Sequence, residues 1–170
     1  AYFIDSVSKW KEEYEEVRKT KKNRKKEDVS LAIEDEVATK RKEKNILNRR
    51  AHLVILAQNQ KGLSNLFQLV SKSFQPESFY RYPRIDYDML EKYGEGVMAS
   101  SACLGGVYAG DYWDNREEGT EVVASAMRET TRRMMKALGR RWFGELQWNN
   151  VPEQHELNKC IVQMHYEYGI

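Results

Sequence analysis

Two side chains of metal-binding type stand beside short apolar stretches of this sequence. His52 opens the apolar residues 52–57, and Cys103 follows residues 97–100 within the segment 100–106, SSACLGG. Imidazole nitrogen and thiolate sulfur are preferred ligands of zinc, which usually takes three or four ligands from the protein. Two ligands are too few for a stable site. Either both residues are structural, or the remaining ligands lie outside the 170 residues, and we favour the second interpretation.

Other residues with chemical potential favour structural interpretations. Glu145 and Gln147 alternate along one expected strand, and a carboxylate that points inward there would need a hydrogen-bonding partner. We expect His155 and His165 on the surface of the last helix and Cys160 packed inside. No Walker-type phosphate loop, Gly-x-Ser-x-Gly elbow or Cys-x-x-Cys pair occurs in the sequence.

The composition fits one α/β domain with a sizeable core, and its charge is unevenly distributed. The first 50 residues hold 15 Lys and Arg against 11 Asp and Glu, whereas residues 51–170 hold 13 against 15. A dedicated nucleic-acid binder would carry a basic face throughout.

No apolar run approaches the roughly 18 residues that span a bilayer, and no signal peptide is present, so we expect no membrane partner. The two cysteines lie in dissimilar contexts, which indicates free thiols and a cytoplasmic location.

A repeated order of strand and helix positions these residues. We expect strands at residues 2–4, 52–57, 97–100 and 142–147, and helices at residues 63–74, 86–94, 122–138 and from Pro152 onward. The continuous apolar run 52–57 predicts a strand buried on both faces, and the repeated order predicts parallel strands. In β/α barrels the functional side chains lie where strands end. Cys103 satisfies that placement, whereas His52 begins its strand.

The composition of residues 5–50 predicts a basic, mostly helical insertion in the domain. Trp10, Tyr14 and Val17 have helical spacing, as have Ile33 and Val37, which predicts two solvated helices. The basic block 21–26 between them is expected to form a mobile loop. It is either a solvated connection, which we favour, or an arm that contacts phosphates.

Several motifs in a fixed order resemble the polymerase and histidinol phosphatase (PHP) domain of the bacterial DNA polymerase III alpha subunit. They cover roughly residues 51–170 and comprise HLVILAQN at 52–59, GLSNL at 62–66, VSK at 70–72, FY at 79–80, PRID at 83–86, EGV at 95–97, SSACLGG at 100–106, GELQ at 144–147 and PEQ at 152–154. Residues 1–4 resemble the strand tail that follows a metal-binding glutamate in that family. The ordered set is far more specific than any single motif.

The resemblance implies a distorted seven-stranded β/α barrel, here a partial (β/α)7 barrel without its first and last strands. Residues 1–4 would end one barrel strand, residues 5–50 would be the charged insertion, and residues 51–170 would form the central part of the PHP domain. Such barrels hold a cluster of divalent metals, zinc or manganese, and His52 and Cys103 fall on two of the ligand positions. The other ligands, and the polymerase palm that binds magnesium, would lie outside this sequence.

The resemblance also implies what the parent protein does. Some family members use the metal site for 3′–5′ exonuclease or phosphoesterase chemistry, and in others the domain braces the polymerase. The expected partners are DNA and deoxynucleotides, together with replisome subunits such as a proofreading exonuclease or a sliding clamp. We expect the 170 residues alone to be inactive. The alternatives are a free-standing PHP phosphoesterase and a non-catalytic interaction module.

Overall fold

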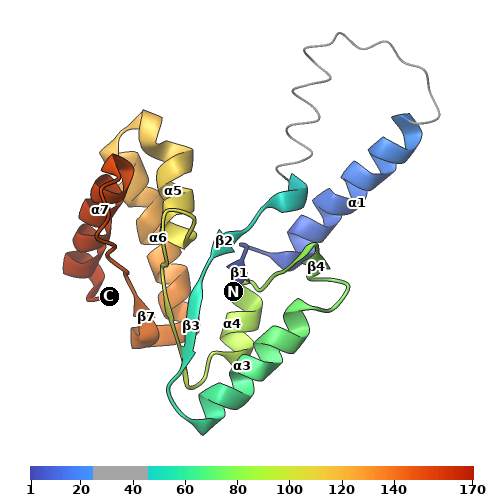
Figure 1. Ribbon diagram of the computed structural model, residues 1–170, viewed down its shortest axis with the longest axis horizontal. Helices are drawn as coiled ribbons and strands as arrows, with labels where there is room; N and C mark the ends of the chain where they lie inside the picture. The colour runs from blue at the N-terminus through green and yellow to red at the C-terminus, as the bar shows by residue number, and fades with distance from the viewer. Residues whose placement is uncertain (25–45) are drawn as a thin grey trace.

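The computed structural model describes residues 1–24 and 46–170, which form a mixed α/β fold (Figure 1). The elements are, in chain order, β1 (Tyr2–Phe3), α1 (Val7–Arg24), β2 (Ala51–His52), β3 (Val54–Ala57), α3 (Gln60–Ser73), β4 (Phe79–Tyr80), β5 (Tyr82–Pro83), α4 (Tyr87–Tyr93), β6 (Val97–Ser100), α5 (Val107–Asn115), the 3-10 turn η1 (Arg116–Glu118), α6 (Thr120–Leu138), the 3-10 turn η2 (Gly139–Arg141), β7 (Trp142–Phe143) and α7 (Pro152–Tyr168). Helices α5, α6 and α7 lie together at one end, and α1 extends from the other (Figure 1).

The largest described sheet has the strand order β3–β6–β7. Strands β6 and β7 are parallel, as the repeated order of elements predicts. Strands β3 and β6 are antiparallel, with Val54 opposite Ser100, so the prediction of parallel strands is wrong for this pair. The connection explains the difference. Between β3 and β6 the chain reverses through α3, the β4–β5 hairpin and α4, whereas α5 and α6 carry it across to β7.

Helices cover this sheet on one face only. On the covered face Ala99 and Trp142 are 2% and 1% exposed, whereas Leu56 on the opposite face is 55% exposed. The prediction that residues 52–57 form a strand buried on both faces is therefore wrong. An apolar run shows that a strand is possible, but β3 lies at the edge of the sheet, where Val54 and Leu56 have no covering layer.

The long helices follow the apolar periodicity of the sequence. Helix α6 contains the predicted stripe at 122–138, and its buried residues include Val123, Met127 and Leu138. Asp86 caps α4 as predicted, since its Oδ1 accepts a hydrogen bond from the Met89 amide at 3.0 Å. Its Oδ2 accepts from the amide of Val7 at 2.8 Å, so the same carboxylate ties the start of α1 to α4.

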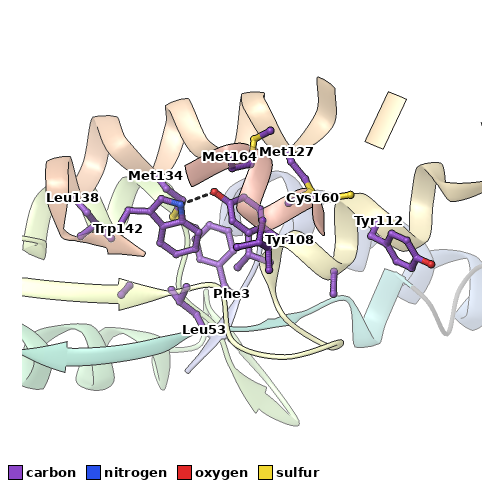
Figure 2. Close-up of a cluster of buried hydrophobic side chains, with 14 of the residues drawn as sticks. Phe3, Leu53, Tyr108, Tyr112, Met127, Met134, Leu138, Trp142, Cys160 and Met164 are labelled. Atoms are coloured by element: carbon purple, nitrogen blue, oxygen red, sulfur yellow. Dashed lines mark hydrogen bonds between the residues drawn. The ribbon is translucent and has the colours of Figure 1, made fainter. Parts of the chain in front are cut away.

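Helix α5 was not predicted, although it supplies much of the core. Its Tyr108 is fully buried, and Figure 2 shows the indole of Trp142 directed at the Tyr108 hydroxyl, which accepts a hydrogen bond at 2.8 Å. That hydroxyl also bonds to the Oγ1 of Thr131 at 2.6 Å. Burial raises the pKa of Tyr108 to about 12. The polar atoms of this aromatic pair are thus satisfied inside the core.

Helix α1 is more deeply packed than the sequence predicts. Trp10, Tyr14 and Val17 share a helix face as expected, but they are 1%, 8% and 7% exposed rather than solvated. Helix α1 runs to Arg24, so the first residues of the basic block 21–26 are helical instead of looped. The remainder of that block and the predicted helix around Ile33 and Val37 lie outside the described residues.

A buried arginine joins three separate pieces of the chain. The guanidinium of Arg84 is fully buried and lies over the ring of Trp10, with 4.2 Å between Cζ and the ring centre. Its nitrogens donate to four backbone carbonyls, those of Leu47 (2.9 Å), Arg49 (3.0 Å), Tyr80 (3.0 Å) and Tyr82 (2.9 Å). Burial, and secondarily the positive charge of Arg50, lowers the pKa of Arg84 to about 10.

Replacing Arg84 tests this junction. Arg84→Lys keeps the charge but lacks the planar fork, so several buried carbonyls would lose their donors. We expect the free energy of unfolding to fall by about 3 kcal/mol. Urea unfolding followed by tryptophan fluorescence measures it, with the exposed hairpin variant Arg81→Lys as the control. Equal urea midpoints for the Arg84 variant and the parent protein would show that the junction contributes nothing.

A second buried charge lies on α5. Asp111 lines a cavity of about 400 Å³ with Asp5, Asp114 and Thr130, and its Oδ2 has no hydrogen-bond partner among the described residues. Burial, reinforced by the charges of Asp5 and Asp114, raises the pKa of Asp111 from 3.8 to about 6. The folded state therefore binds this proton more tightly than the unfolded state does.

The stability contributed by protonated Asp111 is fully present below about pH 4 and is lost as the pH rises through about 6. Asp111→Asn removes this dependence, so we expect the variant to exceed the parent protein in unfolding free energy by up to about 2 kcal/mol at pH 7.5 and by little at pH 4. Urea titrations at both pH values measure the difference, and Glu118→Gln is the control, since Glu118 is exposed in η1 and does not contribute to the pKa shift of Asp111. A difference that does not grow with pH would refute the assignment.

Candidate functional site

His52 and Cys103 lie side by side although 51 positions separate them in the sequence. The Nδ1 atom of His52 is 3.4 Å from the Sγ atom of Cys103. His52 is exposed and Cys103 is half-buried, so solvent reaches the pair. A nitrogen and a sulfur bound to one tetrahedral zinc ion at about 2.1 and 2.3 Å lie roughly 3.6 Å apart. The separation of the two atoms therefore fits a shared ion.

Backbone contacts hold His52 in this position. Tyr2 of β1 pairs with His52 of β2, and their ring centres are 5.6 Å apart. The His52 amide donates to the carbonyl of Gly105 at 2.7 Å. The Gly105 amide points at Sγ of Cys103 from 3.4 Å, and a Cβ at Gly105 would lie only 3.3 Å from Nδ1 of His52. The absent side chain at Gly105 thus leaves room for the imidazole.

A tight turn after β6 positions Cys103. Ala102 has a φ of 60°, which is uncommon for a residue with a side chain, and the Gly106 amide closes the turn onto the Cys103 carbonyl at 2.7 Å. A Cβ at Gly106 would lie 1.9 Å from the Ser101 carbonyl oxygen, so only glycine fits there. Strained backbone of this kind concentrates at functional sites.

The Glu145 carboxylate has the hydrogen-bonding partners that an inward-pointing carboxylate needs. The Ser100 hydroxyl donates a hydrogen bond to Oε2 of Glu145 at 2.5 Å. The side-chain amide of Gln147 donates to Oε1 at 2.9 Å. The Glu145 backbone amide in turn donates to the Ser101 hydroxyl at 2.9 Å. These bonds fix the carboxylate beside the end of β6, just before the turn that carries Cys103.

A polar chain continues from this carboxylate into α7. Asn158 donates to the Gln147 carbonyl at 2.9 Å and accepts from the Gln154 side chain at 2.9 Å. Gln154 is fully buried. Neither Gln154 nor Asn158 was among the residues nominated from the sequence. The available signal was two polar residues four positions apart among the buried residues of an amphipathic helix, where each needs a partner.

These residues meet at one cavity. Its volume is about 660 Å³, and His52, Cys103, Glu145 and Gln147 all line it. Apolar side chains form much of the remaining wall, namely those of Leu53, Val54, Leu66, Leu69, Val70, Phe74 and Ile85. Within residues 1–24 and 46–170 no group of three or more His, Cys, Asp or Glu is arranged to hold a metal ion. The described part of the site therefore offers the His52–Cys103 pair and, elsewhere on the wall of the same cavity, the Glu145 carboxylate.

The other nominated residues lie elsewhere. His155 and His165 are exposed on α7, as predicted, and neither lines the cavity. Cys160 is 6% exposed and belongs to the core, and both cysteines are free thiols. Burial raises the pKa of Cys160, which favours an unreactive neutral thiol.

Comparison with known proteins identifies the fold family. The sequence model of the PHP domain matches residues 4–148. The chain belongs to the PHP domain family. This PHP chain is 37% identical over 133 residues to the DNA polymerase III subunit alpha of Aquifex aeolicus, an alignment that covers 78% of the chain and 11% of that protein. It is 36% identical over 119 residues to the same subunit of Borreliella burgdorferi, covering 70% of the chain and 10% of that protein.

A second type of polymerase also matches. The DNA polymerase III PolC-type of Staphylococcus saprophyticus is 39% identical over 77 residues, which cover 45% of the PHP chain and 5% of that protein. The PHP chain thus spans about a tenth of the length of its alpha-subunit relatives. Among its described helices, none is long and apolar enough to cross a membrane.

Proposed function

We propose that this chain is the PHP portion of the alpha subunit of a bacterial replicative DNA polymerase, and that its cavity is a metal-dependent phosphodiesterase site. The observation that carries the second part is the 3.4 Å separation of His52 Nδ1 and Cys103 Sγ at the edge of the cavity. The relatives support the first part, because those aligned over most of the chain are DNA polymerase III alpha subunits. DNA, deoxynucleotides and replisome subunits such as a proofreading exonuclease or a clamp are then its partners.

His52 and Cys103 would supply two ligands to a divalent ion, zinc or manganese. Histidine and thiolate together suit zinc better than manganese, since manganese favours oxygen ligands. A bound metal would polarise a phosphodiester and lower the pKa of a coordinated water. The site requires further ligands, and in the proposed complete protein a distorted seven-stranded barrel would bring them to the same cavity. Magnesium would serve the separate polymerase centre.

The chain's own residues prepare this chemistry. The Gly105 amide donates a hydrogen bond to Cys103 Sγ and so fixes the direction in which the sulfur points. The Tyr2 ring and the Gly105 carbonyl fix the orientation of His52. Glu145, held by Ser100 and Gln147, presents a carboxylate on the same cavity. From that position it can accept a proton from a water molecule or hold one in place.

A second candidate function is a non-catalytic brace for the polymerase. The observation that favours it is the absence of a third ligand beside His52 and Cys103 among the described residues. In that case the cavity would stabilise the subunit or dock a partner, and 3′–5′ exonuclease activity would be lacking. Metal content and hydrolysis separate the two functions.

Cys103→Ala tests the metal site. The variant is made in the natural-length protein, that is, the proposed complete alpha subunit. We expect it to lose at least half of its tightly bound zinc, because removing a thiolate ligand typically weakens zinc binding strongly. Metal content measured by mass spectrometry and hydrolysis of bis(4-nitrophenyl) phosphate should decline together. Cys160→Ala is the matched control, since it removes the other thiol from the core and should leave both readings unchanged.

The outcomes separate the proposals. Zinc content and hydrolysis that are unchanged in Cys103→Ala would refute the ligand assignment. If the unmutated natural-length protein carries no metal and hydrolyses no diester, that result would favour the non-catalytic brace. Thermal unfolding of both cysteine variants checks that the folded state survives.

A further inference from the structure

Arg50 lies two residues before His52 and contacts two aromatic rings. Its Cζ lies 4.0 Å from the ring centre of Tyr82 and 5.2 Å from that of Tyr2. The same Tyr2 ring contacts the imidazole of His52, with 5.6 Å between the ring centres. The Tyr2 ring therefore contacts both the guanidinium and the candidate metal ligand.

Most of the hydrogen-bonding capacity of Arg50 is unused. A guanidinium carries five N–H donors. Nη1 donates to the Asn48 carbonyl at 2.9 Å, but Nε is buried without an acceptor among the described residues. No carboxylate described in the structure lies within ion-pair distance of Arg50. Its neighbours differ in this respect, since Arg49 pairs with Glu13 at 3.2 Å and Arg84 donates to four carbonyls.

Such an arginine suits a phosphate group. Contact with the Tyr82 and Tyr2 rings holds the guanidinium without neutralising its charge. Little side-chain entropy is then lost when its free N–H groups bind two phosphate oxygens. Arg50 also lines the cavity that contains Asp5, Asp111 and Asp114, but it forms no ion pair with any of these three carboxylates. Arg84 already anchors the β4–β5 hairpin to the segment that contains Arg50, so the anchoring does not need the spare donors.

We propose that Arg50 binds a backbone phosphate of single-stranded nucleic acid and so positions the neighbouring phosphodiester at the His52–Cys103 centre. This inference rests on the proposed phosphodiesterase function and identifies its substrate class. The Tyr2 ring sets the spacing between the phosphate-binding residue and the ligand pair. Arg50 does not bind the metal itself, so its loss should weaken nucleic-acid binding without changing metal content.

Binding of fluorescein-labelled hexathymidylate to the natural-length protein, followed by anisotropy between 50 and 300 mM salt, tests the proposal. Arg50→Ala should weaken binding about tenfold, because a charge-assisted hydrogen-bond pair is lost. The slope of log affinity against log salt should fall by about 0.7, the value for one phosphate contact with a single strand. Arg49→Ala is the matched control, with the same charge change one residue away, and should weaken binding less than twofold.

Equal losses in the Arg49 and Arg50 variants would overturn the proposal, since net charge would then explain the binding. Unchanged binding in Arg50→Ala would overturn it as well. If Arg50→Ala does not fold, Arg50→Lys and Tyr82→Leu replace it, and each should weaken binding severalfold. Metal content separates this proposal from the previous one. Cys103→Ala should lose zinc and keep hexathymidylate binding, whereas Arg50→Ala should keep zinc.

Discussion

The fold depends on one buried guanidinium that has no carboxylate partner among residues 1–24 and 46–170. Arg84 satisfies its charge with four backbone carbonyls, from the segment before β2 and from the β4–β5 hairpin, and with the face of Trp10 on α1. A single carboxylate would pair with one edge of the guanidinium. Four separate backbone carbonyls instead allow the arginine to hold several chain segments together. The segment fixed in this way leads directly into β2, so the position of His52 depends on this junction.

The site occupies the open side of a sheet that helices cover on the other side. The covered face is closed by α6 and by the Tyr108–Trp142 pair. On the open side, the turn after β6 brings Cys103 to His52, and a polar chain from α7 through Gln147 orients Glu145. Rigid packing on one face thus supports polar groups on the other, which is the arrangement that a preorganised site requires.

Much of this fold follows from the sequence, because apolar spacing determines which helix face is buried. The stripe of α6, the cap at Asp86 and the strand at 97–100 are confirmed. The pairing of β3 was not predictable, since periodicity carries no information on strand direction. Helix α5 was not predicted, and three of its four buried residues, Val107, Tyr108 and Ala109, are consecutive instead of having helical spacing.

The same distinction holds for the site. Residue type and family resemblance nominate His52 and Cys103, but their separation depends on tertiary contacts at Gly105. The partner Ser100 of Glu145 was not predicted either, because its hydroxyl meets the carboxylate only once β6 and β7 are paired.

The most direct measurement of the central claim is zinc K-edge X-ray absorption of the natural-length protein. If His52 and Cys103 share one ion, the spectrum should contain a sulfur ligand at about 2.3 Å and nitrogen at about 2.0 Å, and the sulfur shell should disappear in Cys103→Ala. A first shell of oxygen and nitrogen alone, or a sulfur shell that survives in that variant, would contradict the account.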